Sequence, residues 1–240
     1  MVDNVSQIIH TIYKVFLRRF QSVRCYDMEK FRYDVIKDYK LYDVFSPVIK
    51  KVNNLFYATT YVGKENIPAE GRYILACNHR HALDPFIAAV GVQPRAVHFM
   101  SKTENFPNGA ARWFMTHMNA YPVERGKADR KAIEYSISLL GKGLVLGIFP
   151  EGTRSATGEF GEPKNGAVYL ALKTKSDIVP TALIYKEGKR KEAKVTIRYG
   201  KVIKFEELNL PEKPTKAQMK AASEFVMSKI KELYDLGLEG

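Results

Sequence analysis

Apolar and polar residues follow two different rhythms along this chain. Near the amino terminus, apolar side chains recur every three or four residues, the period of one face of an α-helix. From Tyr61 onward, short apolar runs alternate with helical stretches, the pattern of an α/β domain. We therefore expect a pair of amphipathic helices within residues 1–60 and an α/β domain at 61–240. The expected fold is a mixed, mostly parallel sheet flanked by helices.

Within the second part, apolar runs bounded by turn residues predict strands, and 3.6-residue periodicity predicts helices. The strands are expected at 72–77, 96–100, 144–149, 178–185, 194–199 and 202–205. The helices are expected at 86–90, 109–117, 129–140, 166–174 and 216–234.

The first amphipathic helix is the best candidate for contact with a membrane. Seven apolar side chains lie on one arc: Val5, Ile9, Ile12, Tyr13, Phe16, Phe20 and Val23. Arg19 and Arg24 flank this arc, where long basic side chains can reach phosphate headgroups. A second helix is expected to begin at Ser46 and Pro47. Both helices could instead pack on the core, but the basic and aromatic character of the first favours a membrane-docking motif.

Composition and charge narrow the choice of partners. With 240 residues, 45% of them hydrophobic, the chain can bury one substantial core. A formal net charge of +12 favours an anionic partner, and without recognisable nucleic-acid motifs an anionic membrane surface is preferred to nucleic acid. No secretory signal is visible, no apolar stretch is long enough to span a bilayer, and two distant cysteines suit a reducing compartment. We therefore expect a peripheral, monotopic protein on the cytoplasmic face of the membrane.

The turn at 78–84, Asn-His-Arg-His-Ala-Leu-Asp, is the first candidate for chemistry. His79 and Asp84 would point about 140° apart on a helix and to opposite faces of a strand. Only a turn can bring them together. Asp84 and Pro85 are expected to be the N-cap and first residue of the next helix. His79 then lies at the carboxyl end of a strand, where open α/β sheets place their ligands.

Three interpretations of this turn are open. Asp84 could simply cap a helix while His79 and His81 belong to an ordinary loop. The same three residues could bind a metal, although His10, His98 and His117 form no recognisable ligand pair elsewhere. Finally, His79 could act as a general base whose tautomer is fixed by Asp84. The turn by itself does not decide among them.

Other polar residues follow predicted strands in the same way. The loop at 149–155, Phe-Pro-Glu-Gly-Thr-Arg-Ser, combines backbone amides with the guanidinium of Arg154, which makes a good anion receptor. It could also be an ordinary turn with a surface arginine. Arg125 stands at a strand end after Tyr-Pro-Val-Glu, and Lys102 follows the strand at 96–100.

Four blocks taken together resemble a known family. They are His79-x-x-x-x-Asp84, Tyr-Pro-Val-Glu-Arg125-Gly, the loop at 149–155 and Val179-Pro-Thr-Ala182. In order and spacing they are similar to the four blocks of glycerolipid acyltransferases, over residues 67–183. Glu124 stands where the family commonly has Asp, and Thr181 where it frequently has an apolar residue. Neither departure touches the proposed chemistry.

The resemblance is closest to bacterial members that acylate 1-acyl-glycerol-3-phosphate, also called lysophosphatidic acid. It implies transfer of a fatty acyl group from acyl carrier protein or coenzyme A to the sn-2 hydroxyl, making phosphatidic acid without a cofactor or a metal. His79 would be the general base and Asp84 its orienting partner. The acceptor phosphate would be held by Arg125, Arg154 and Lys102. The acceptor loop and oxyanion donors would come from Glu151, Gly152 and Thr153.

Alternatives of other kinds stay open at this stage. The acceptor could be glycerol-3-phosphate. A thioesterase would need a nucleophile, for which Cys77 or Ser155 could be considered. A non-catalytic, basic membrane-binding module would consume no thioester. Candidates for the wall of an acyl-chain tunnel, or for ordinary core positions, are Phe106, Trp113 and Phe114.

Overall fold

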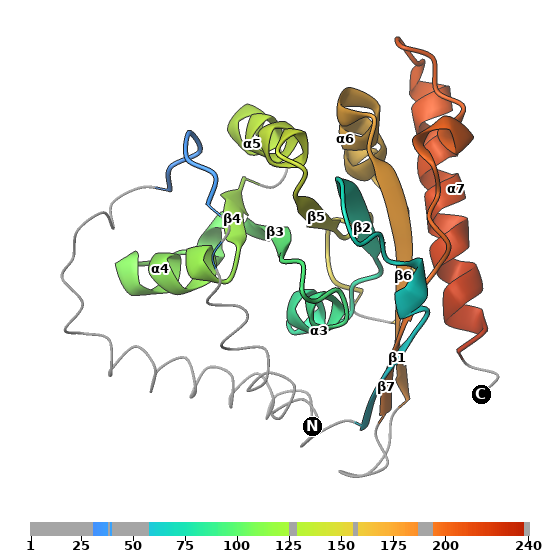
Figure 1. Ribbon diagram of the computed structural model, residues 1–240, viewed down its shortest axis with the longest axis horizontal. Coiled ribbons are helices and arrows are strands. Elements are labelled where there is room, and N and C mark those ends of the chain that lie inside the picture. Colours follow the sequence, from blue (N-terminus) through green and yellow to red (C-terminus); the bar gives the residue numbers. More distant parts are fainter. Residues whose placement is uncertain are drawn as a thin grey trace.

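A computed structural model describes residues 31–37, 39, 58–124, 129–155, 158–186 and 194–237. These residues form a seven-stranded sheet between two layers of helices (Figure 1). The strand order is β1-β7-β6-β2-β5-β3-β4. Neighbouring strands are parallel except β6 and β7, which are antiparallel. The mixed, mostly parallel α/β sheet is therefore confirmed, whereas the two expected amino-terminal helices lie outside the described residues.

Most predicted elements occur within a residue or two of their expected bounds. The strands are β1 (Ala58–Val62), β2 (Tyr73–Cys77), β3 (Val97–Lys102), β4 (Ala120–Val123), β5 (Val145–Ile148), β6 (Asp177–Lys186) and β7 (Lys194–Tyr199). The helices are α3 (Asp84–Val90), α4 (Gly109–His117), α5 (Arg130–Gly141), α6 (Gly166–Thr174) and α7 (Lys216–Asp235).

The predicted strand at 202–205 is wrong. Ile203 makes a single antiparallel bridge to Ile178, and the chain then enters a 3₁₀ helix, Phe205–Leu208. The carboxylate of Asp177 accepts hydrogen bonds from the Phe205 amide (3.0 Å) and the Lys204 ammonium (2.8 Å). These side-chain contacts turn the backbone immediately after the bridge, so a second strand pairing does not form.

The sheet is buried on both faces, which explains the continuous apolar runs of its central strands. In β2, Tyr73, Leu75 and Cys77 pack toward α3, while Ile74 and Ala76 pack toward α5, α6 and α7. All five side chains are fully buried. Figure 1 shows α3 on one side of the sheet and α5, α6 and α7 on the other. His79, two residues after Cys77, follows the strand on the α3 side.

Part of the region before β1 packs on the α/β core. The Tyr33 hydroxyl donates to the Pro122 carbonyl of β4 (3.0 Å), and the ring of Phe31 meets Tyr135 of α5 edge to face at 5.5 Å. The edge strand β1, which the sequence patterning missed, straddles the expected boundary at residue 60. Division into two domains at that position stays a prediction. Among the helices described, none is both long and apolar enough to cross a membrane.

Candidate active site

The turn after β2 brings His79 and Asp84 together. The Nδ1 atom of His79 lies 2.8 Å from Oδ2 of Asp84. Asp84 is completely buried, and the side chain of His79 is 10% exposed. An imidazole bound to a carboxylate through Nδ1 keeps its other nitrogen, Nε2, available to accept a proton.

Asp84 does not cap helix α3 as the sequence suggested. The helix begins at Asp84 itself, with Leu83 at the N-cap position and no side-chain cap. The carboxylate turns back instead, and Oδ2 accepts the backbone amides of Arg80 (2.6 Å) and His81 (2.8 Å). Asp84 therefore closes the turn that precedes it, which holds the carboxylate in place beneath His79.

A further partner of Asp84 comes from a distant strand. The hydroxyl of Tyr185, on β6, donates to Oδ1 of Asp84 at 2.5 Å across 101 residues of sequence. The ring of His81 meets the Tyr185 ring edge to face, with centroids 4.3 Å apart. The strand predicted at 178–185 ends at Tyr185, but no local pattern in the sequence indicates a contact with Asp84. The contact arises from the register of β6 on β2.

Glu151 joins the predicted anion-binding loop to the turn. Its Oε1 atom accepts the His79 amide (2.8 Å), and Oε2 accepts the Gly161 amide (3.0 Å). The Ser155 amide in turn donates to the carbonyl of His79 (2.9 Å). The loop therefore holds both backbone groups of His79, and the 6% exposed Glu151 carboxylate is used for this support.

The tight turn of the same loop depends on Gly152. Its φ of +72° lies in the left-handed region, and an added Cβ would come within 2.9 Å of Cδ and Nζ of Lys164. The Gly152 amide donates to the Phe149 carbonyl (2.9 Å), so in this conformation it serves the turn and not an oxyanion. Thr153 and Arg154 follow it and are exposed.

An aromatic floor lies beneath the imidazole. The rings of His79 and Phe149 stack with centroids 4.0 Å apart, and Phe149 stacks on Phe99 at 5.7 Å. Phe86 and Phe114, one of the proposed tunnel residues, pack against the same core cluster on the α3 side of the sheet. The base therefore stands between an apolar layer and the polar loop.

The structure describes two of the three cationic residues that were predicted to bind phosphate, Lys102 and Arg154. Lys102 is the last residue of β3. Strand β5 lies between β3 and β2, and its pairing with both strands places Lys102 at the same height in the sheet as residue 78. The two backbones are then two strand spacings, or about 10 Å, apart. Burial first, and then the charges of Arg80 and Arg154 among others, lower the pKa of His81 below its usual value. Arg154 thus exerts its charge on the turn. Arg125 lies outside the described residues.

Two residues were considered as nucleophiles for a thioesterase, Cys77 and Ser155. Cys77 is fully buried, and burial raises the pKa of its thiol far above the usual value. The Ser155 hydroxyl oxygen accepts the Gly158 amide (2.9 Å). As for a metal, no cluster of three or more His, Cys, Asp or Glu suited to an ion occurs in the part of the chain that the structure describes.

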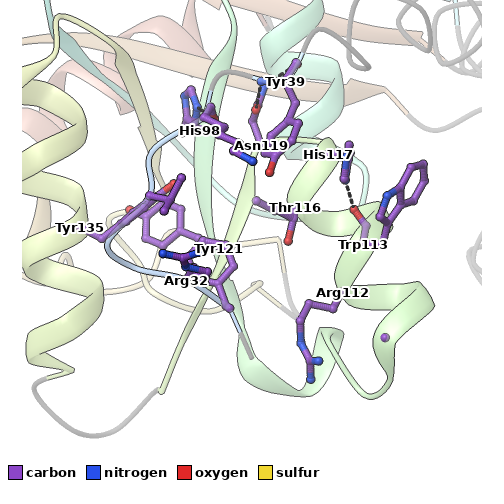
Figure 2. Close-up of a pocket in the computed structure, with 15 residues that line it drawn as sticks. Arg32, Tyr39, His98, Arg112, Trp113, Thr116, His117, Asn119, Tyr121 and Tyr135 are labelled. Carbon is purple, nitrogen blue, oxygen red and sulfur yellow. Dashed lines mark hydrogen bonds between the residues drawn. The ribbon is translucent and has the colours of Figure 1, made fainter. Parts of the chain in front are cut away.

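A cavity of about 310 Å³ lies away from the turn and is lined in part by residues 31–37, Tyr39 and helix α4 (Figure 2). His117 is among its lining residues, and its ring stacks on Trp113 at 4.2 Å and meets Tyr39 at 4.3 Å. Burial lowers the pKa of His117. Trp113, expected as a possible tunnel residue, lines this cavity, which includes no residue of the turn or of the loop at 149–155.

The sequence of this chain is similar to those of known proteins. A family model described as Acyltransferase matches residues 58–184. The chain is 31% identical over 201 residues to the 1-acyl-sn-glycerol-3-phosphate acyltransferase of Bacillus subtilis (strain 168), covering 80% of this chain and 96% of that protein. It is 33% identical over 122 residues to the Streptococcus pneumoniae protein of the same name, covering 50% of this chain and 45% of that protein.

The fold also matches a solved structure. The crystal structure of the 1-acyl-sn-glycerophosphate (LPA) acyltransferase PlsC from Thermotoga maritima superimposes with a TM-score of 0.62 at 21% identity. The match covers 97% of this chain and 98% of that one. At this identity the likeness concerns the fold.

Proposed function

Because this chain belongs to the acyltransferase family, we propose that the turn at 78–84 and the loop at 149–155 form its active site. The reaction is transfer of a fatty acyl group to 1-acyl-glycerol-3-phosphate, which yields phosphatidic acid. The observation that carries the site assignment is the buried contact of 2.8 Å between His79 Nδ1 and Asp84 Oδ2. It lies at the carboxyl end of β2, where α/β sheets bind ligands.

His79 acts as the general base in this proposal. Its Nε2 takes the proton of the acceptor's sn-2 hydroxyl as that oxygen attacks the carbonyl carbon of the acyl thioester. The tetrahedral oxyanion then collapses, the carbon–sulfur bond breaks, and the thiolate recovers the proton from His79. The products are phosphatidic acid and a free thiol. No covalent intermediate on the protein is needed, which agrees with the burial of Cys77.

Asp84 and Glu151 prepare His79 for this step. Asp84 fixes the tautomer and stabilises the positive imidazolium that forms as the proton moves. Glu151 holds the His79 amide at 2.8 Å and so fixes the backbone from which the imidazole projects. A base held in advance avoids the cost of ordering it in the transition state.

The acceptor phosphate is held by cations around the same edge of the sheet. Arg154 and Lys102 follow β5 and β3, and Arg125 completes the set by its place in the sequence after β4. Guanidinium groups suit a phosphate because they can donate two parallel hydrogen bonds. With the Gly152 amide engaged in its turn, the backbone amide of the exposed residue Thr153 is the better candidate for contact with the oxyanion.

One assay tests both the reaction and its base. Purified full-length protein is supplied with lysophosphatidic acid or glycerol-3-phosphate, and with an acyl thioester of acyl carrier protein or coenzyme A. We expect phosphatidic acid from lysophosphatidic acid, and a kcat about 10²–10⁴-fold lower for His79→Ala. Folded His79→Ala with the turnover of the wild type would falsify the assignment. Free fatty acid formed without an acceptor would indicate hydrolysis instead.

The amino-terminal region supports a second part of the proposal, peripheral attachment to an anionic membrane. In the sequence, seven apolar side chains between Val5 and Val23 recur at the spacing of one helical arc, flanked by arginines. Partial burial of each at about 25 cal/mol per Å² would give several kcal/mol of binding. Each basic residue near an anionic leaflet contributes about 1 kcal/mol more.

Vesicle sedimentation tests this attachment. The double variant Phe16→Asp with Phe20→Asp should remain in solution with anionic vesicles that bind the wild type. It should also lose far more activity on bilayer-embedded acceptor than on acceptor dispersed in detergent. Binding of the wild type should weaken as salt is added, because salt screens the electrostatic attraction. Part of the binding should persist, because salt does not screen the hydrophobic contribution. If the double variant sediments as before, this helix is not the membrane surface.

A further inference from the structure

Tyr185 lies at the end of a strand that extends past its neighbour. Strand β6 has ten residues and β2 has five, and their pairing ends where Cys77 meets Thr181. Beyond that point β6 continues antiparallel to β7, where Tyr185 pairs with Val195. Because β2 and β6 are parallel, Tyr185 is level with the turn that follows β2. The overhang carries its side chain over the catalytic turn.

Asn78 ties this overhang to the turn. Its side-chain amide donates to the Leu183 carbonyl (3.0 Å), and its side-chain oxygen accepts the Leu183 amide (2.7 Å). One carboxamide therefore replaces the two backbone bonds that a continuing β2 would have made. Asn78 is 3% exposed, so both bonds lie in the interior, where such contacts are well protected from water.

The Tyr185 hydroxyl completes the hydrogen bonding of a buried carboxylate. Oδ2 of Asp84 faces His79 Nδ1 and the two backbone amides of the turn. Oδ1, the other oxygen, accepts the Tyr185 hydroxyl at 2.5 Å. Asp84 is 0% exposed, and an ionised carboxylate at such a position must be satisfied by donors. A donor on each oxygen also fixes the plane of the carboxylate.

We propose that Tyr185 is a positioning residue for the acyl transfer, holding the Asp84 carboxylate in the orientation that presents Oδ2 to His79. This inference rests on the proposed function, because it gives Tyr185 a role only if His79 is the base. Tyr185 touches no reacting atom and acts through Asp84. The edge-to-face contact of its ring with His81 keeps the hydroxyl aimed at the carboxylate.

The chain offers a matched control on the next strand. Tyr199 of β7 is 2% exposed, and its hydroxyl donates to the Ala88 carbonyl of α3 at 2.6 Å. Tyr185→Phe and Tyr199→Phe thus each delete one oxygen from a buried tyrosine that binds the same helix. Only the first contacts Asp84. A general effect of losing a buried hydroxyl would appear in both variants.

In steady-state assays with lysophosphatidic acid, we expect Tyr185→Phe to lower kcat roughly tenfold. KM for either substrate should stay within about twofold, and Tyr199→Phe should keep kcat within about twofold. Because Tyr185 contacts Asp84 and not the substrates, the loss should appear in kcat and not in KM.

A double-mutant cycle shows whether Tyr185 acts through Asp84. In an Asp84→Asn background, Tyr185→Phe should change kcat by less than about twofold. A tenfold loss that persists in that background, equal losses in the two tyrosine variants, or wild-type kcat for Tyr185→Phe would each overturn the proposal. If His79→Ala is inactive while Tyr185→Phe resembles the wild type, only this inference fails. Full turnover by His79→Ala would remove the proposed function and this inference together.

Discussion

The turn at 78–84 and the loop at 149–155 lie side by side but are built differently. In the turn, His79 and Asp84 are buried, and Asp84 receives hydrogen bonds from backbone amides and from Tyr185. The loop starts buried at Glu151 and becomes exposed at Thr153 and Arg154. Proton transfer requires atoms held to a fraction of an ångström, whereas a phosphate can be met by flexible cations at a surface. The contrast supports our proposal that the chemistry belongs to the turn and acceptor binding to the outer part of the loop.

The sharpest challenge to this comparison is Asp84→Asn. The variant keeps the shape of the side chain but removes the negative charge that stabilises positively charged His79. We expect kcat to fall about 10²–10⁴-fold with little change in KM. Circular dichroism and thermal unfolding provide the control for folding. Folded Asp84→Asn with kcat within a few-fold of the wild type would show that the carboxylate has no part in the chemistry.

Glu151→Gln tests whether the buried start of the loop supports the turn. The amide group of Gln would face one of two backbone amides, His79 or Gly161, that now donate to the carboxylate. The expected loss is about 2 kcal/mol of unfolding free energy, or roughly 4–8 °C in Tm. In kinetics, kcat should fall by about ten- to a hundredfold. A change confined to KM would mean that Glu151 contacts the acceptor and does not support His79.

Arg154→Ala tests the exposed end of the loop. Losing one charge-assisted contact of about 1.5–3 kcal/mol should raise KM for lysophosphatidic acid ten- to a hundredfold. Lys at this position should rescue only part of the loss, because it lacks the planar guanidinium. Arg130→Ala, at an exposed arginine on α5 paired with Glu134, is the matched control. Equal use of a monoacylglycerol, which lacks the phosphate, would contradict an anion site at Arg154.

The smallest effect is expected for Cys77→Ala. This thiol is fully buried and lies on the α3 side of β2, so its loss should cost only about 1 kcal/mol of stability. Both kcat and KM should stay within about twofold of the wild type. An inactive but folded Cys77→Ala would instead point to a thiol nucleophile and a covalent acyl intermediate. Iodoacetamide labelling of the native protein, with Cys77 and Cys25 distinguished by peptide mapping, gives a second measure, and no reaction is expected at Cys77.

The sequence predicted the central elements well where burial on both faces leaves long apolar runs, as in β2 and β5. The sequence-based prediction was wrong or incomplete at the edge strand β1 and at residues 202–205. Strand β1 is five residues with alternating, partial exposure at a sheet edge, so its pattern is weak. At 202–205 the apolar residues suggested a strand, but contacts to Asp177 turned the chain after one bridge. Residues distant in sequence decided that case.

His79 and the loop at 149–155 could be singled out from the sequence alone, because each follows an apolar run at a predicted strand end, and Asp84 because it stands where the next helix is expected to begin. Only the tertiary structure decided how they work together. The Asp84 carboxylate turns away from its helix, Glu151 binds the His79 amide 72 residues away, and Tyr185 reaches Asp84 across 101 residues. Local pattern fixes which residues stand at the ends of strands. Which side chains then meet depends on strand order and register, which arise from packing of the whole sheet.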